Sequence, residues 1–440
     1  MIRPAVLAAV LSFALVLPSD AHAAHRPSSR VRILDIAGNV RSAFSVATAN
    51  QAGGFTVAIA DLGTDGKPEI ILGSGLGNAP EVLVLRQDGS RIGRFLAYAA
   101  NAGMGINVAA CDVDGDGSAD IVTAPQRGGG PHIRAFDRLG NLKANFFAFD
   151  ATDRSGVNLA CGDVDADGKD EIVTLPAAGA EPLVRVWDVT ASGAVMAQEF
   201  LALEPGDLRG VVGTVVDGRL VVSNAHASEV TVRTIAFASP ATLIESTTMD
   251  LDVTGISGIL TRDGKTALTS ASDGKILDAS GAEIMTVTGS PFGAVNAAAA
   301  DLDGDGIEEW IVADGKPAFT DDDAAKTIVV DLSDQRLYAY EHGVLANTFL
   351  VSTAAKGWRT PVGKHSVLAK VPSVRYAGRG YDLGTMPYNL RIIPHIYIHP
   401  ATWHSNFGHP MSHGCVNVAL ENAKWVYEWA AQGIPVEVRT

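Results

Sequence analysis

The chain has 440 residues, enough for two or three domains, and 47% of them are hydrophobic. Its 49 acidic residues outnumber 34 lysines and arginines, which gives a formal net charge of −15. This balance excludes a basic footprint for nucleic acid. No second apolar segment of membrane-spanning length follows the one at the N-terminus.

The first residues have the pattern of a secretory signal peptide. A cationic residue, Arg3, precedes an apolar run from Ala5 to Leu17, and an Ala-His-Ala cleavage pattern ends at Ala23. The run is shorter than a bilayer-spanning helix needs. We therefore expect residues 1–23 to be removed on export, leaving no transmembrane anchor. The alternative is an uncleaved anchor or a buried N-terminal helix.

Residues 31–316 contain a repeated acidic pattern. The segments DLGTDGKPE, DVDGDGSAD and DVDADGKDE begin at Asp61, Asp112 and Asp163, so the offset is 51 residues both times. Each segment lies between apolar, strand-like runs. A period of roughly 40 to 50 residues with about four short strands is typical of a β-propeller blade.

Two weaker copies begin near Val211 and Ile256, and a last acidic segment begins at Asp301 without a second half after it. The segment before Asp61 resembles the segment before Asp163, so the N-terminal strands would complete this last blade. Such a joint closes the ring and removes its free edges. We expect six blades. A seven-bladed ring is the alternative if the weaker copies in the middle of the region are divided differently.

The acidic segments follow the pattern D-x-D-x-D-G-x-x-[DE], in which alternate oxygen ligands and a glycine turn suit a hard cation such as Ca²⁺. An EF-hand is excluded, because its twelfth position requires Glu and is here Thr123, Thr174 or Val312. Solvated Asp-Gly turns are the alternative interpretation. The predicted ligands are Asp112, Asp114, Asp116, Asp120, Asp163, Asp165, Asp167, Glu171, Asp301, Asp303, Asp305 and Glu309.

A fourth acidic segment is weaker, because Gly63 replaces the second aspartate and leaves Asp61, Asp65 and Glu69. These loops resemble the FG-GAP (integrin-α-like) propeller repeats over residues 31–316. The resemblance implies structural calcium that rigidifies each blade. It also implies a surface that binds a protein or glycan ligand, and it implies no catalysis.

The chain has three cysteines. Cys111 and Cys161 occupy matching places of two repeats, and their small, apolar surroundings favour buried free thiols over a disulfide. Cys415 lies apart from them, in the segment HPMSHGCVNV. An unpaired cysteine in an exported chain suggests a functional thiol.

A short acidic and Ala-rich linker, residues 317–325, leads to a different kind of sequence. Residues 326–440 contain strand-like runs such as TIVVDLSDQRLYAYEHG, TPVGKHSVLAKV and RIIPHIYIHP, then an amphipathic helix in LENAKWVYEWAAQG and a closing strand, IPVEVRT. This pattern predicts a small β-rich domain with one or two helices. The chain as a whole is therefore expected to be mainly β.

The surroundings of Cys415 are those of a nucleophile, which needs a nearby base and donors for an oxyanion. Gly414 lets the backbone approach closely, so the amides of Gly414 and Cys415 are candidate donors. His399 or His413 could be the base. The alternatives are a buried structural Cys–His pair and a zinc site, although the histidine spacings follow no compact zinc pattern.

The segment IYIHPATWHSNFGHPMSHGCVNV resembles the active-site signature of the L,D-transpeptidase (YkuD-type) catalytic domain, and RTPVGKHSV and MPYNLRI match its supporting stretches. The resemblance spans residues 326–440. It implies that Cys415 is the nucleophile and His399 the general base. The other motif residues, which support catalysis, shape the loop or touch substrate, are His413, Gly414, Ser412 and Asn417.

The resemblance implies a two-step acyl transfer without a catalytic cofactor. Cys415 would attack the carbonyl before the terminal D-alanine of a peptidoglycan stem, and an amine of a second stem would accept the acyl group in a 3→3 cross-link. Water as acceptor would make an L,D-carboxypeptidase, and a lipoprotein amine would give an anchored protein. This substrate places the mature protein in the periplasm or cell wall. The rivals are an adhesion-type propeller with an inactive transpeptidase domain and a calcium-gated enzyme.

Overall fold

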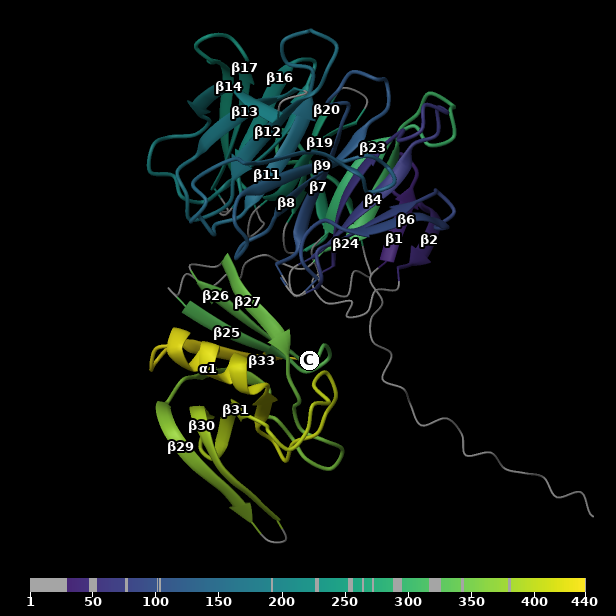
Figure 1. Ribbon diagram of the computed structural model, residues 1–440. Coiled ribbons are helices and arrows are strands. Elements are labelled where there is room, and N and C mark those ends of the chain that lie inside the picture. The colour runs from purple at the N-terminus through teal and green to yellow at the C-terminus, as the bar shows by residue number, and fades with distance from the viewer. Residues whose placement is uncertain are drawn as a thin grey trace, which may run out of the picture.

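The computed structural model describes residues 30–46, 54–75, 78–100, 102, 104–190, 193–225, 229–251, 256–262, 265–270, 273–287, 295–315, 326–341, 344–378 and 381–439. The expected signal peptide and linker, residues 1–23 and 317–325, lie outside these ranges. Within the described ranges, no helix is both long and apolar enough to cross a membrane. Figure 1 shows two bodies, a larger one built from the repeats and a smaller one that contains the helix.

Residues 30–315, called here the repeated region, form six antiparallel four-stranded sheets in the part of the chain that is described. The strands of the first three sheets in chain order are β3 (Phe55–Ala60), β4 (Glu69–Ser74), β5 (Glu81–Leu85), β6 (Arg91–Leu96), β7 (Ile106–Cys111), β8 (Asp120–Pro125), β9 (His132–Phe136), β10 (Leu142–Phe147), β11 (Val157–Gly162), β12 (Glu171–Pro176), β13 (Leu183–Thr190) and β14 (Gly193–Leu201).

The two weaker copies also form complete sheets, as the sequence predicts. Their strands are β15 (Val211–Val216), β16 (Arg219–Asn224), β17 (Glu229–Ala236), β18 (Thr242–Asp250), β19 (Ile256–Arg262), β20 (Lys265–Ser270), β21 (Lys275–Asp278) and β22 (Glu283–Thr286).

The sixth sheet joins the two ends of the repeated region. Its order is β2 (Val40–Ser45), β1 (Arg30–Leu34), β24 (Glu309–Asp314) and β23 (Val295–Ala300). The register pairs Val31 with Ala313, and the buried side chains of Arg32 and Asp314 form an ion pair of 2.6 Å. The N-terminal strands therefore complete the sheet that the last acidic segment begins.

The first strands of the six sheets contact one another in cyclic order. β3 contacts β7, β7 contacts β11, β11 contacts β15, β15 contacts β19, β19 contacts β23, and β23 contacts β3. Apolar side chains fill the space between neighbouring sheets, as where Ile71 and Val82 cluster with Ile106 and Ile121. Because both faces of a sheet are covered in this way, middle strands such as β4 and β5 read as apolar runs rather than as an alternating pattern.

Cys111 and Cys161 form a disulfide, with their Cα atoms 5.5 Å apart. The expectation of two free thiols is therefore wrong. Cys111 is the last residue of β7 and Cys161 the last but one of β11, so the two lie 50 residues apart, one fewer than the repeat offset of 51. Packing of these neighbouring first strands brings the two side chains into contact. Among the described residues, Cys415 is the one free cysteine.

The C-terminal domain, residues 326–439, consists of two sheets and one described helix. The five-stranded sheet has the order β27 (Val344–Leu350), β26 (Arg336–Glu341), β25 (Lys326–Asp331), β33 (Pro435–Arg439) and β28 (Gly363–Ser366). The other sheet has the order β29 (Ala369–Gly378), β30 (Tyr381–Ile393), β31 (Ile396–Pro400) and β32 (Val416–Val418).

Helix α1 (Leu420–Trp429) lies against β30 and β31 (Figure 1). Both sheets and the helix share one core, to which Ile328, Leu337, Ile398, Val416 and Val426 contribute. The shared core holds β31 and β32 side by side, and these are the strands that flank the predicted nucleophile.

Candidate active site

Cys415 lies in the loop that leads into β32, and this loop is bonded to the segment after β27. The Ser412 amide donates to the Thr353 carbonyl at 2.9 Å, and the Ala355 amide donates to the Ser412 carbonyl at 2.9 Å. On the other side, β31 and β32 are parallel, with His399 paired to Asn417. The backbone around Cys415 is therefore fixed from two directions.

Ser412 organises the loop from within. Its hydroxyl donates to the Cys415 carbonyl at 2.6 Å and accepts the Gly414 amide at 3.0 Å. This is the loop-shaping role, one of the two that the motif implies for Ser412. The Gly414 amide, a predicted oxyanion donor, is thus bonded to Ser412 in this structure, and its role as a donor stays a prediction. The Cys415 amide stays a predicted donor as well.

Gly414 is required at its position for steric reasons. It has a φ of +135°, and a Cβ there would lie 3.0 Å from the Arg359 carbonyl oxygen and 3.0 Å from Ile396 Cδ1. The hydroxyl of Thr360, in the T-P-x-G segment, donates to the Gly414 carbonyl at 2.9 Å. The supporting stretch and the nucleophile loop thus pack directly on each other.

His399 is 2% exposed, and its hydrogen bonds define its tautomer. Nδ1 lies 2.9 Å from the Pro400 carbonyl oxygen, which can only accept, so Nδ1 carries the proton. Nε2 then accepts the Asn417 side-chain amide at 3.0 Å. Asn417 is itself 2% exposed and holds His399, so the implied contact with substrate is replaced here by a contact with the base.

An aromatic ring covers the imidazole. Tyr376 of β29 stacks on His399 with ring centroids 4.0 Å apart and an interplanar angle of 17°. The Tyr376 hydroxyl donates to Asn389 Oδ1 of β30 at 2.9 Å. The β29–β30 hairpin, which the motif alone does not reveal, therefore positions the base.

Burial sets the ionisation of both reacting groups. It lowers the pKa of His399 to about 4, although the hydrogen bond to Pro400 opposes this shift. Burial also raises the pKa of the Cys415 thiol, and the backbone amide of Tyr397 opposes that shift. At neutral pH the resting groups are therefore a neutral imidazole and a thiol. Such a pair works by proton transfer during attack rather than through a preformed thiolate.

The remaining predicted residue of the motif, His413, lies on the surface. Its ring packs against Trp358 with centroids 4.4 Å apart, and Trp358 is 58% exposed. The Cys415 sulfur lies 3.8 Å from the backbone carbonyl of His395, at the turn between β30 and β31. This contact uses a backbone atom of the turn, so no side-chain pattern in the sequence could indicate it.

Three groups of carboxylates in the repeated region have ligand atoms within 4.8 Å of one another. No other group of this kind, including one of histidines and Cys415, occurs within the described residues. The predicted ligands Asp120, Asp167 and Asp305 fall outside the groups, and so does the weaker Asp61 loop. The groups are Asp112, Asp114 and Asp116; Asp163, Asp165 and Glu171; and Asp301, Asp303 and Glu309.

The Asp163 loop fits a hard cation best. Its first carboxylate accepts the Gly168 amide through Oδ2 at 3.1 Å, while Oδ1 is buried without a hydrogen-bond partner. A buried carboxylate oxygen without a donor is costly, and a calcium ion would satisfy it. Gly168 has a φ of +89°, which is the turn that the pattern assigns to glycine.

The other two loops contain a cationic side chain of the protein. Lys143 Nζ lies 2.7 Å from Asp114 Oδ2 and 2.8 Å from Asp120 Oδ1. Arg41 Nη1 lies 3.2 Å from Asp303 Oδ2 in the last loop. Calcium at these loops has to displace a lysine or an arginine, so the three matching sequence segments are not equivalent sites.

Comparison with known proteins assigns the C-terminal region. Residues 325–438 match the family YkuD, described as the L,D-transpeptidase catalytic domain. The chain is 28% identical over 123 residues to L,D-transpeptidase 1 of Mycobacterium tuberculosis, a match that covers 25% of this chain and 49% of that protein. The chain thus spans about half the length of this curated relative.

Solved structures of the same kind are similar to this chain. An L,D-transpeptidase (Yku) from Stackebrandtia nassauensis is 26% identical, covers 27% of this chain and 58% of its own, and has a TM-score of 0.25. The catalytic domain of an L,D-transpeptidase from Enterococcus faecium is 25% identical, covers 26% and 95%, and has a TM-score of 0.24. The family match confirms the prediction of a YkuD-type domain in the C-terminal part of the chain.

Proposed function

We propose that this protein is an exported peptidoglycan L,D-transpeptidase. The observation that carries the proposal is the family match over residues 325–438, because the same region holds the free thiol of Cys415 beside the strand that carries His399. The curated relative that matches is itself named an L,D-transpeptidase.

The site supports the following order of events. Cys415 Sγ attacks the carbonyl before the terminal D-alanine of a stem peptide, and its proton passes to Nε2 of His399. The protonated imidazole gives this proton to the departing amine of D-alanine, which leaves a thioester on Cys415. An acceptor amine then attacks the thioester, and its proton returns through His399 to the sulfur.

One hydrogen bond has to change before this can happen. The lone pair of Nε2 that would take the proton is occupied by the Asn417 amide in the resting structure. Substrate binding has to shift the imidazole or share this bond. Candidate donors for the oxyanion are the amides near the sulfur, those of Cys415 and Tyr397.

Export is supported by two independent features. The first 23 residues have the signal-peptide pattern, and the disulfide between Cys111 and Cys161 is a bond that persists in oxidising compartments. The periplasm or cell wall is also where peptidoglycan stems are found. A reactive thiol there has to be kept reduced.

For the repeated region we propose a six-bladed β-propeller of the FG-GAP type with structural calcium. The cyclic contacts of the first strands and the sheet shared by both ends support a closed ring. The propeller would position the C-terminal domain on the wall by binding a glycan or protein.

The test is incubation of the mature protein with disaccharide-tetrapeptide fragments, followed by mass spectrometry. Loss of D-alanine together with cross-linked dimers, both absent for Cys415→Ala, is the expected result. Loss of D-alanine alone would identify an L,D-carboxypeptidase. If neither product forms with peptide or lipoprotein amines as acceptors, the transpeptidase proposal fails and an adhesion protein with an inactive domain replaces it.

A further inference from the structure

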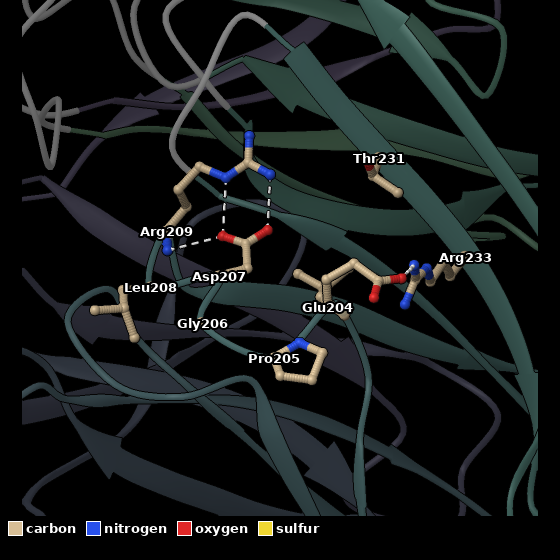
Figure 2. A pocket seen from close by; sticks show the side chains of 9 residues that line it. Glu204, Pro205, Gly206, Asp207, Leu208, Arg209, Thr231 and Arg233 are labelled. Carbon is tan, nitrogen blue, oxygen red and sulfur yellow. Dashed lines mark hydrogen bonds and ion pairs between the residues drawn. The ribbon is translucent and has the colours of Figure 1, made fainter.

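A cavity of about 460 Å³ lies between the third and fourth sheets of the repeated region, on the side of the loop that joins β14 to β15 (Figure 2). This volume falls within the roughly 300–1,000 Å³ of small-molecule sites. The polar and apolar side chains that line it include Glu204, Asp207, Leu208, Arg209, Thr231 and Arg233.

Within the described residues, three of the junctions between neighbouring sheets share one contact, so the cavity can be compared with its copies. In each copy an alanine after the fourth strand accepts a hydrogen bond from an arginine in the third strand of the next sheet. The pairs are Arg134 with Ala97 at 2.7 Å, Arg185 with Ala148 at 2.7 Å and Arg233 with Ala202 at 3.3 Å.

The residue after that alanine differs among the copies. In the first two junctions it is aromatic, and the arginine lies over its ring, 5.0 Å from the centroid of Tyr98 and 5.2 Å from that of Phe149. In the third it is Leu203, and Arg233 pairs with Glu204 at 2.5 Å. The cavity therefore lies at the junction that lacks a ring of its own.

The charges that line the cavity are balanced. Arg209 holds Asp207 in a two-point ion pair of 2.8 and 2.7 Å, and Arg233 holds Glu204 (Figure 2). A charged ligand at Arg209 or Asp207 would gain little, because it would have to break their pair, in which the Asp207 side chain is only 10% exposed. Paired carboxylates can still accept further hydrogen bonds, and paired guanidinium groups can still donate them. A hydroxyl group can donate to the first and accept from the second.

The loop is held in place before any ligand binds. The Gly206 amide donates to Glu181 Oε2 at 2.9 Å, and the Gly179 amide donates to the Leu208 carbonyl at 2.8 Å. Leu208 is 48% exposed and supplies an apolar surface at the cavity. A fixed loop lowers the entropy cost of binding a rigid ring.

We propose that this cavity binds a neutral sugar ring of an oligosaccharide. The missing ring, the balanced charges and the mixture of hydroxyl-binding and apolar groups all favour such a ligand over an ion or a charged peptide. The proposal does not depend on the chemistry at Cys415. An N-acetylated glycan and a plain glucan share this chemistry, so both serve as probes.

The test is calorimetric titration of the full-length protein with chitotetraose and with cellotetraose. Leu203→Phe restores the ring that the neighbouring junction has, and we expect it to weaken binding by at least about tenfold, or about 1.4 kcal/mol. Thermal unfolding checks that this variant folds. Glu204→Gln, at a side chain that is 78% exposed, keeps the shape and should weaken binding severalfold.

Glu199→Gln is the matched control, because Glu199 pairs with Arg185, the equivalent of Arg233, at a junction filled by Phe149. It should leave binding unchanged. Binding of chitotetraose alone would assign the site to N-acetylated glycans, and binding of both probes would assign it to the sugar ring itself. Absence of binding to both, or binding that survives Leu203→Phe and Glu204→Gln, would overturn the proposal.

Discussion

The repeated region and the C-terminal domain reveal their sites in different ways. In the repeated region the contacts of Ala97, Ala148 and Ala202 recur from sheet to sheet and show what is structural, and a departure such as Leu203 points to the proposed sugar site. The C-terminal domain has no copies. There the site is marked by a buried polar residue, His399, whose partners come from distant strands.

The largest expected effect concerns the base in the C-terminal domain. Replacing His399 by alanine should lower kcat by about 10²–10⁴-fold, the usual contribution of a general base. Steady-state release of D-alanine measures this. The control is His404→Ala, at a histidine of the neighbouring loop that contacts Phe407 and Asn406. Equal losses in both variants would show that the loop, and not the base, was disturbed.

The second effect is on stability: His399 should make unfolding of the C-terminal domain depend on pH, and it should not affect the repeated region. His399 has a pKa of about 4 when folded and about 6.5 when unfolded, so the unfolded chain binds its proton first as pH falls. The contribution of His399 to the free energy of unfolding is fully present above about pH 6.5 and is lost as pH falls towards 4. The total loss is up to about 3 kcal/mol.

Thermal unfolding of the C-terminal domain between pH 7 and 4 measures this loss, and His399→Gln should flatten the curve over that window. A variant that keeps the full pH dependence would assign it to other groups. The transition of the repeated region should not respond to this substitution in either case.

The third effect is on the Asn417 hydrogen bond. Asn417→Ala removes a donor to the neutral form of Nε2, so the pKa of His399 should rise and the acid limb of kcat/KM should move to higher pH. The same change frees the lone pair but leaves the ring less well held, and we expect kcat to fall by roughly tenfold. Asn406→Ala, at an exposed side chain, is the matched control; an unmoved acid limb would show that Asn417 does not act through the base.

The sequence predicts the features of these regions that depend on local pattern, but not those that depend on tertiary contacts. The offset of 51 residues, the joint between the two ends and the motif around Cys415 all depend on local pattern, and the six sheets and the family match agree with them. The prediction of two free thiols is wrong because the disulfide depends on tertiary packing of β7 against β11, which the sequence pattern does not encode. The bond from Gly414 to Ser412 and the stacking of Tyr376 on His399 also depend on geometry that no spacing encodes.

The smallest effect tests whether the acidic loops differ as the structure indicates. Chelation should lower the Tm of the repeated region, mainly through the Asp163 loop, where a buried oxygen has no other partner. Lys143 competes for the second loop, since its ammonium group lies 2.7 Å from Asp114 and 2.8 Å from Asp120. Lys143→Ala should therefore raise calcium affinity there, whereas Lys143→Arg keeps a competing cation.

Calorimetric titration with calcium measures this directly, and we expect a gain of roughly tenfold in affinity at one site of Lys143→Ala. In the absence of calcium the same variant should be less stable, because Asp114 and Asp120 lose their cation and repel each other. Added calcium should reverse that loss, since an ion that binds only the folded state stabilises it. A Lys143→Ala protein that calcium does not restabilise would show that the lysine is the permanent partner of this loop, and that the aspartates of this loop serve the turn rather than a metal.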